Sequence, residues 1–169
     1  MLAADYGENK SRPLALEPVD NQPAFAKIAA RVMGAGIPGI LILTDQPELF
    51  KQYRGFVVLR VKNPEEGHMG QVAAALEYCK STSQMILPGH LGGLSSDVMN
   101  RLINESLSRP AHIIYAATFE KEYPTCAVVN RGILPSVKLA IEEKRYDLLE
   151  LYKTLDHRVV RFADQSLFE

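Results

Sequence analysis

The chain has 169 residues, a formal net charge of −1, 47% hydrophobic residues and 23% charged residues. A chain of this length can bury one substantial core, so we predict a single domain over residues 1–169. The near-neutral charge excludes a strong field for nucleic acid or an anionic membrane. The longest apolar runs, residues 37–44 and 111–118, are too short to span a bilayer, and the N-terminal region lacks a signal-peptide pattern. We therefore expect a cytoplasmic protein with no nucleic-acid or membrane partner.

Apolar runs typical of strands alternate with segments that have helical spacing along most of the chain. In chain order, the pattern predicts helices over residues 22–33, 47–53, 70–80, 97–106, 135–143 and 146–154, and strands over residues 39–43, 55–61, 84–87, 112–117, 125–130 and 158–162. Short continuous apolar runs such as GILIL are typical of parallel strands that are buried on both faces. Ser95, Ser96 and Asp97 are suitable cap and first-turn residues for the helix that they begin.

The order of these elements predicts a fold class. Strands that alternate with helices of this size favour a three-layer α/β/α sandwich with a mostly parallel sheet. The strands at 112–117 and 125–130 are separated by the polar turn FEKEYP, so we expect them to form an antiparallel hairpin at one edge. In such a fold, the ligand site lies at the carboxyl ends of the central strands.

The two cysteines are expected to be inert. Cys79 falls in a predicted helix and Cys126 in a predicted strand. A zinc site would need clustered ligands, and a disulfide framework would need more cysteines. Buried free thiols are the better interpretation.

Three stretches, in order and with plausible spacing, carry a family resemblance. They are LALEPVDNQP, similar to K-x-L-L-x-L-x-G-x-P; YPTCAVVNRGILPSVKLAIEEKRYDLLELYKTL, similar to a segment that begins H-P-x-x-A-L; and the closing HRVVRFADQSLFE. The stretch MILPGHLGGLSSDVMNRL is similar to a strand followed by P-C-D-x-P and a helix. Together these stretches resemble the molybdenum cofactor guanylyltransferases, the MobA family, which have the nucleotide-diphospho-sugar transferase fold.

The resemblance implies a reaction and its cofactors. Members of this family transfer GMP from GTP to molybdopterin: a phosphate of the acceptor attacks the α-phosphorus, and pyrophosphate leaves. This chemistry needs backbone amides and cations near the phosphates, and carboxylates that hold Mg²⁺. GTP and Mg²⁺ are therefore the expected substrate and cofactor if the chain is active.

The chain departs from the family pattern where the phosphates would bind. Two glycines of the pattern L-A-G-G are replaced by Ala4 and Asp5. These side chains hinder a close approach of the backbone, and Asp5 adds a negative charge. Pro13 and Leu14 stand at the places of the pattern's Asp and Lys. The aspartate of P-C-D aligns with His90, although Mg²⁺ prefers oxygen ligands.

Candidate site residues follow from this alignment, while the catalytic residues stay unknown. The nucleotide-binding candidates are Leu2, Ala3, Lys10, Arg12 and Asn63. Leu2 and Ala3 keep their places in the pattern, and Lys10 and Arg12 supply cations after a local shift of the loop. Asn63 lies in VKNPEE, where the family recognises guanine, close to the alternative candidates Glu65 and Glu66. His90 is a candidate for binding a transition metal or a phosphate, or else a plain loop residue. The other histidines, His68, His112 and His157, are expected to be structural.

Two functions remain open on this basis. In the first, the chain is a divergent MobA-like nucleotidyltransferase that uses GTP, Mg²⁺ and molybdopterin. In the second, it is a catalytically degenerate relative that serves as a binding or partner-docking module, with a molybdoenzyme maturation protein as the partner. The missing lysine, glycines and aspartate favour the second, because each loss removes stabilisation of the transition state.

Overall fold

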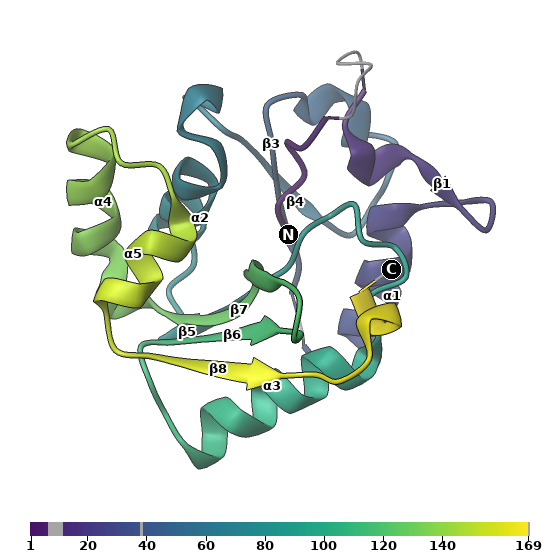
Figure 1. Ribbon diagram of the computed structural model, residues 1–169. Coiled ribbons are helices and arrows are strands. Elements are labelled where there is room, and N and C mark those ends of the chain that lie inside the picture. Colours follow the sequence, from purple (N-terminus) through teal and green to yellow (C-terminus); the bar gives the residue numbers. More distant parts are fainter. Residues whose placement is uncertain (7–11, 38, 169) are drawn as a thin grey trace.

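The computed structural model describes residues 1–6, 12–37 and 39–168 (Figure 1). The α-helices in these ranges are α1 (Ala24–Gly34), α2 (Gly67–Tyr78), α3 (Ser96–Ser108), α4 (Leu134–Glu142) and α5 (Leu148–Thr154). The strands are β1 (Pro18–Val19), β2 (Gln22–Pro23), β3 (Leu41–Thr44), β4 (Val57–Arg60), β5 (Ser83–Ile86), β6 (Ile113–Ala117), β7 (Glu122–Asn130) and β8 (His157–Arg161). The predicted alternation of strands and helices is confirmed.

The first three residues connect two sheets into one. Strands β3 and β4 form a parallel pair, and a second sheet has the order β5-β7-β6-β8. Between them lies Leu2, which forms parallel bridges to Leu43 on one side and to Pro88 on the other. Backbone bonds from Leu2 N to Leu87 O (2.8 Å) and from Ala3 N to Leu43 O (2.8 Å) complete the connection. The resulting order is β4, β3, residues 1–3, β5, β7, β6 and β8.

The predicted sheet needs two corrections. The sheet is mixed, because β7 runs antiparallel to both β5 and β6, whereas the other neighbouring strands are parallel. Strands β6 and β7 do form the expected antiparallel pair, but the pair lies inside the sheet, since β8 pairs parallel to β6 and takes the edge. The predicted helix over residues 47–53 is only a short 3-10 helix, Pro47–Phe50.

Helices cover both faces of the sheet (Figure 1). Helices α1 and α3 pack in one apolar cluster, which includes Phe25, Ile28 and Leu102. Helices α2, α4 and α5 pack in a second cluster on the other face, which includes Leu76 and Tyr152. The sequence explains this division for α1, α3, α4 and α5, because each of them carries its buried residues at helical spacing on one side. In α2 the four consecutive residues from Met69 to Val72 are all buried. The three layers agree with the predicted architecture.

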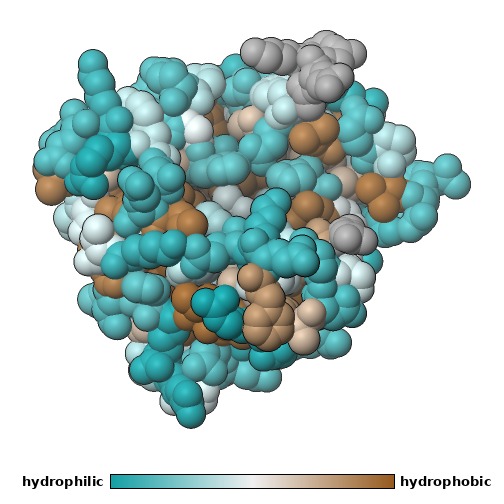
Figure 2. Space-filling model, viewed as in Figure 1, coloured by the Kyte–Doolittle hydropathy of each residue, from teal (hydrophilic) through white to brown (hydrophobic). Residues whose placement is uncertain are grey.

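The surface shown in Figure 2 is mostly hydrophilic, with apolar residues in small separate groups. No α-helix in the described part of the chain combines the length and hydrophobicity that a bilayer crossing requires.

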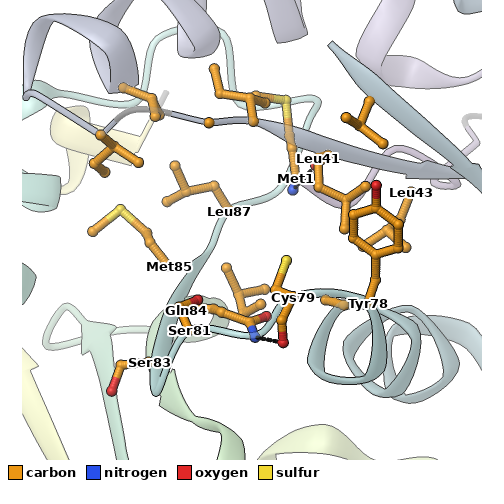
Figure 3. A pocket seen from close by; sticks show the side chains of 17 residues that line it. Met1, Leu41, Leu43, Tyr78, Cys79, Ser81, Ser83, Gln84, Met85 and Leu87 are labelled. Atoms are coloured by element: carbon orange, nitrogen blue, oxygen red, sulfur yellow. Dashed lines mark hydrogen bonds between the residues drawn. The ribbon is translucent and has the colours of Figure 1, made fainter.

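A cavity of about 480 Å³ lies between β3 and β5 (Figure 3). Its lining is mostly apolar and includes Met1, Leu41, Met85 and the end of α2 at Tyr78 and Cys79. Gln84 donates from Nε2 to the carbonyl oxygen of Cys79 at 3.4 Å. Cys79 comes directly after the last residue of α2, so it lies just outside the observed helix although it was predicted to be in one. It lines the cavity and is only partly buried.

The two thiols are expected to differ in reactivity. Cys126 is fully buried, and burial raises its pKa to about 12, so it forms no reactive thiolate in the native state. We expect a disulfide reagent to modify one thiol per native molecule rapidly and both thiols after denaturation. Cys79→Ser should abolish the rapid phase, whereas Cys126→Ser should leave it unchanged. Rapid modification of both native thiols would contradict the burial of Cys126.

Candidate functional site

The loops that follow the parallel strands meet at one edge of the sheet. From residues 1–3 the chain proceeds to β3 on one side and later to β5 on the other. The space between residues 1–3 and β5 is therefore a topological switch point, where open α/β sheets bind ligands. Asp5 follows the first of these two strands, and His90 follows the second.

Gly89 holds the two loops close together. Its backbone N–H donates to the carbonyl oxygen of Leu2 at 2.6 Å. A Cβ atom at residue 89 would lie 2.8 Å from the same oxygen, which is too close for any other residue type. The glycine of PGH thus places His90 directly beside the loop that contains Asp5.

Asp5, His68 and His90 form a hydrogen-bonded group, which we name the His–Asp–His cluster. His68 Nε2 lies 2.8 Å from Asp5 Oδ1, and His90 Nδ1 lies 3.1 Å from Asp5 Oδ2. The side chains are 37% exposed for His68, 31% for His90 and 23% for Asp5, so a ligand can reach both rings. His68 comes from the first turn of α2, where the helix dipole also favours a carboxylate nearby.

The environment keeps Asp5 ionised. Burial by itself raises the pKa of a carboxyl group, but the hydrogen bonds and charges of His68 and His90 outweigh it. The pKa of Asp5 therefore lies well below its ordinary value of 3.8. The cluster contains a permanent negative charge between two imidazoles at neutral pH.

A second group of polar side chains adjoins the cluster. The hydroxyl of Tyr6 donates to Asp45 Oδ1 and accepts from Gln46 Nε2 at 2.9 Å. Burial and the adjacent Asp45 carboxylate raise the pKa of Tyr6 far above its ordinary value, so the hydroxyl remains a donor. This contact fixes the loop after residues 1–3 against the loop after β3.

The cluster does not suit Mg²⁺, the cofactor that the family resemblance implies. Mg²⁺ binds oxygen ligands in octahedral geometry. Both carboxylate oxygens of Asp5 already accept hydrogen bonds, and the other two members of the cluster offer only nitrogen. Throughout residues 1–6, 12–37 and 39–168, no three His, Cys, Asp or Glu side chains group closely enough to hold a metal ion.

The nucleotide-binding candidates Leu2 and Ala3 are core residues in the structure. Their side chains are 0% and 1% exposed, and their backbone N–H groups donate to neighbouring strands. Leu2 and Ala3 would therefore contribute to nucleotide binding indirectly, by positioning Asp5. Their role as binding residues stays a prediction.

Two of the other candidates, Arg12 and Asn63, form hydrogen bonds to groups outside the cluster. Arg12 is exposed and donates to the carbonyl oxygen of Leu16 at 2.8 Å. Asn63 is exposed and donates to Glu66 Oε1 at 2.6 Å. Lys10 lies outside the described residues. The nucleotide-binding roles of all three stay predictions.

Sequence reasoning placed His90 at the correct edge of the sheet but missed the contribution of His68. His68 was expected to be structural, yet it contacts Asp5 across 63 positions of sequence. Asp5 was interpreted only as an obstacle to phosphate binding, whereas it orients two imidazoles. A signal for His68 did exist, since it stands at the start of the helix that follows β4, and ligand-binding residues in this architecture lie beyond the carboxyl ends of the strands.

Comparisons with known proteins show which proteins this chain is similar to. A probable molybdenum cofactor guanylyltransferase of Flavobacterium johnsoniae is 23% identical over 137 residues, which are 78% of this chain and 72% of the relative. The crystal structure of molybdopterin-guanine dinucleotide biosynthesis protein A from Archaeoglobus fulgidus superposes with a TM-score of 0.77 at 11% identity, covering 95% of this chain and 80% of that one. The manganese complex of Rv0371c from Mycobacterium tuberculosis superposes with a TM-score of 0.68 at 12% identity, covering 96% and 86%.

At these identities, the solved structures establish a common fold, that of the nucleotide-diphospho-sugar transferases. The family model described as MobA-like NTP transferase domain matches residues 1–159, which is most of the chain. The matched residues include all three members of the His–Asp–His cluster. This chain therefore belongs to the family of MobA-like NTP transferase domains.

Proposed function

We propose that the chain binds a nucleoside triphosphate at the switch point and transfers its nucleotidyl group to an acceptor that carries a phosphate. The observation that supports this proposal is the position of the His–Asp–His cluster between residues 1–3 and β5. Ligand chemistry is expected there in an open α/β sheet. The Flavobacterium relative suggests GTP as the donor and molybdopterin as the acceptor, which would be a step of molybdenum cofactor biosynthesis.

The reaction places clear demands on the site. A phosphate oxygen of the acceptor attacks the α-phosphorus of the triphosphate, and pyrophosphate leaves with the electron pair of the broken P–O bond. Negative charge on the phosphates must be met by hydrogen-bond donors in fixed positions. His68 and His90 are suitable donors because Asp5 orients both rings from one carboxylate.

A second candidate function is a binding or partner-docking module without transferase activity. The specific observation in its favour is Asp5, whose side chain and charge replace a glycine of the phosphate-binding pattern. Molybdopterin or a molybdoenzyme maturation protein would be the partner. In this alternative, the cluster stabilises the switch-point loops and has no role in nucleotide chemistry.

Thermal unfolding with nucleotides distinguishes the two functions. A ligand that binds only the folded state at a concentration 100 times its dissociation constant adds about 2.7 kcal/mol of stability. For a chain of this size, that corresponds to a rise in Tm of about 5–10 °C. We expect 1 mM GTP to produce such a rise in buffer containing Mg²⁺, with smaller effects from ATP and CTP.

Pyrophosphate release from GTP in the presence of molybdopterin then tests the transfer itself. GTP binding together with release that depends on the acceptor would support the transferase. An unchanged Tm with all three nucleotides would contradict it and would leave the docking module.

A further inference from the structure

We propose that His68 and His90 bind the phosphates of the ligand directly, with no divalent cation between protein and phosphate. This inference rests on the proposed function, because it takes a phosphate-bearing ligand at the switch point as given. It concerns how the ligand is held, and it departs from the Mg²⁺ chemistry that the family resemblance implies.

The first argument is that both carboxylate oxygens of Asp5 already have a hydrogen-bond partner. Each of its two oxygens accepts a hydrogen bond from an imidazole, at 2.8 and 3.1 Å. A divalent cation at this carboxylate would have to use the remaining lone pairs of these oxygens, directly beside the two imidazoles. It would then find nitrogen ligands where Mg²⁺ prefers oxygen.

The second argument is the orientation of the two rings. His68 uses Nε2 and His90 uses Nδ1 to contact Asp5, which leaves the opposite nitrogen of each ring for another partner. Within the described ranges, neither His68 Nδ1 nor His90 Nε2 forms a hydrogen bond to another protein group. In its doubly protonated form an imidazole donates at both nitrogens, so one ring can serve Asp5 and a phosphate oxygen together.

The third argument is the balance of charge. With both rings protonated, the cluster has a net charge of +1, which complements the negative charge of a di- or triphosphate. Hydrogen bonds from a charged donor to an anion are also stronger than neutral ones. The chemical class of ligand is therefore a pyrophosphate or a nucleoside polyphosphate.

Calorimetric titration with pyrophosphate and with GTP, each in EDTA and in Mg²⁺, tests the proposal. We expect dissociation constants in EDTA to stay within about threefold of those in Mg²⁺. Each of His68→Gln and His90→Gln should weaken binding by about tenfold, as expected for the loss of one charge-assisted hydrogen bond. His112→Gln is the matched control, since His112 is exposed at the start of β6, away from the cluster, and it should bind like the wild-type chain.

His90→Asp gives a second test that does not depend on loss of binding alone. It places a carboxylate where the resemblance pattern has its metal aspartate, so residual binding should become dependent on Mg²⁺. The melting temperature of each variant without ligand confirms that it is folded. Binding by this variant in EDTA with wild-type affinity would contradict a direct role for His90.

The outcomes separate this proposal from the proposed function. If the wild-type chain binds GTP in Mg²⁺ but not in EDTA, direct binding by histidine is overturned, and the nucleotide site stands. If neither pyrophosphate nor GTP binds under any condition, both proposals fail. Equal affinity of His68→Gln, His90→Gln and the wild-type chain would also overturn the direct role of the two rings.

Discussion

Replacement of Phe25 by alanine is expected to lower the free energy of unfolding by about 3–5 kcal/mol. Phe25 lies on the buried face of α1 and is 0% exposed. Its ring forms edge-to-face contacts with Phe50, Tyr53 and Phe56, at centroid distances of 5.2, 4.8 and 5.8 Å. Removal of the ring would lose its transfer free energy and leave a cavity among the three remaining aromatic side chains.

Urea denaturation followed by circular dichroism measures this effect. The matched control is Phe119→Ala, because Phe119 is 80% exposed in the turn between β6 and β7. Its free energy of unfolding should stay within about 0.5 kcal/mol of the wild-type value. Similar losses for the two variants would mean that Phe25 is not at the centre of the core.

The Phe25 variant also bears on the site. Helix α1 contacts the switch-point loop through Arg31, whose Nη1 donates to the carbonyl oxygen of Gly92 at 2.5 Å. Displacement of the helix would move the loop that carries His90. We therefore expect Phe25→Ala to weaken ligand binding in addition to lowering stability.

Asp5→Asn is expected to lower the free energy of unfolding by about 2 kcal/mol at pH 7. Asparagine keeps the shape but loses the charge, and hydrogen bonds to a charged group contribute roughly 1.5–3 kcal/mol. The carboxylate is mostly buried, so solvent screens its contacts with His68 and His90 only weakly. Chemical denaturation of the wild-type and variant chains at pH 7 gives the difference.

The pH dependence has a definite sign. The pKa of Asp5 in the folded state is below its ordinary value of 3.8, so the unfolded state binds more protons as the pH falls through that range. The stabilisation by Asp5 is therefore fully present above pH 3.8 and is lost as the pH falls below that value toward the folded-state pKa. The difference in stability between the wild-type chain and Asp5→Asn should shrink over this interval.

Asp97→Asn provides the control for Asp5. Asp97 is exposed in the first turn of α3, where Ser95 caps the helix, so its loss should produce a smaller change. A difference between wild type and Asp5→Asn that stays constant from pH 5 to pH 2 would contradict a depressed pKa at Asp5.

Local sequence patterns determined most of the secondary structure. Apolar spacing located α1 to α5 and the six longer strands within a few residues, because each element buries one face or both. The predicted cap at Ser95 is confirmed by its hydrogen bond from Asp97 N at 3.1 Å. The family resemblance was also present in the sequence, and the match over residues 1–159 confirms it.

The direction and order of the strands required the tertiary structure. The apolar run of β7 is equally compatible with a parallel or an antiparallel neighbour, and only its bonds to β5 and β6 show that it is antiparallel to both. The role of Met1 to Ala3 as the strand that connects two sheets was likewise missed. Three residues carry too little periodicity to predict a strand.

The site depended most strongly on the fold. Asp5, His68 and His90 are ordinary residues in the sequence, and each one alone favours a solvated or structural interpretation. They meet because parallel strands present their carboxyl ends at the same edge, and because Gly89 allows two backbones to approach closely. The sequence by itself determined the family and the helices and strands, whereas the convergence of three distant side chains was decided by tertiary packing, since hydrogen bonds between them exist only once the sheet has formed.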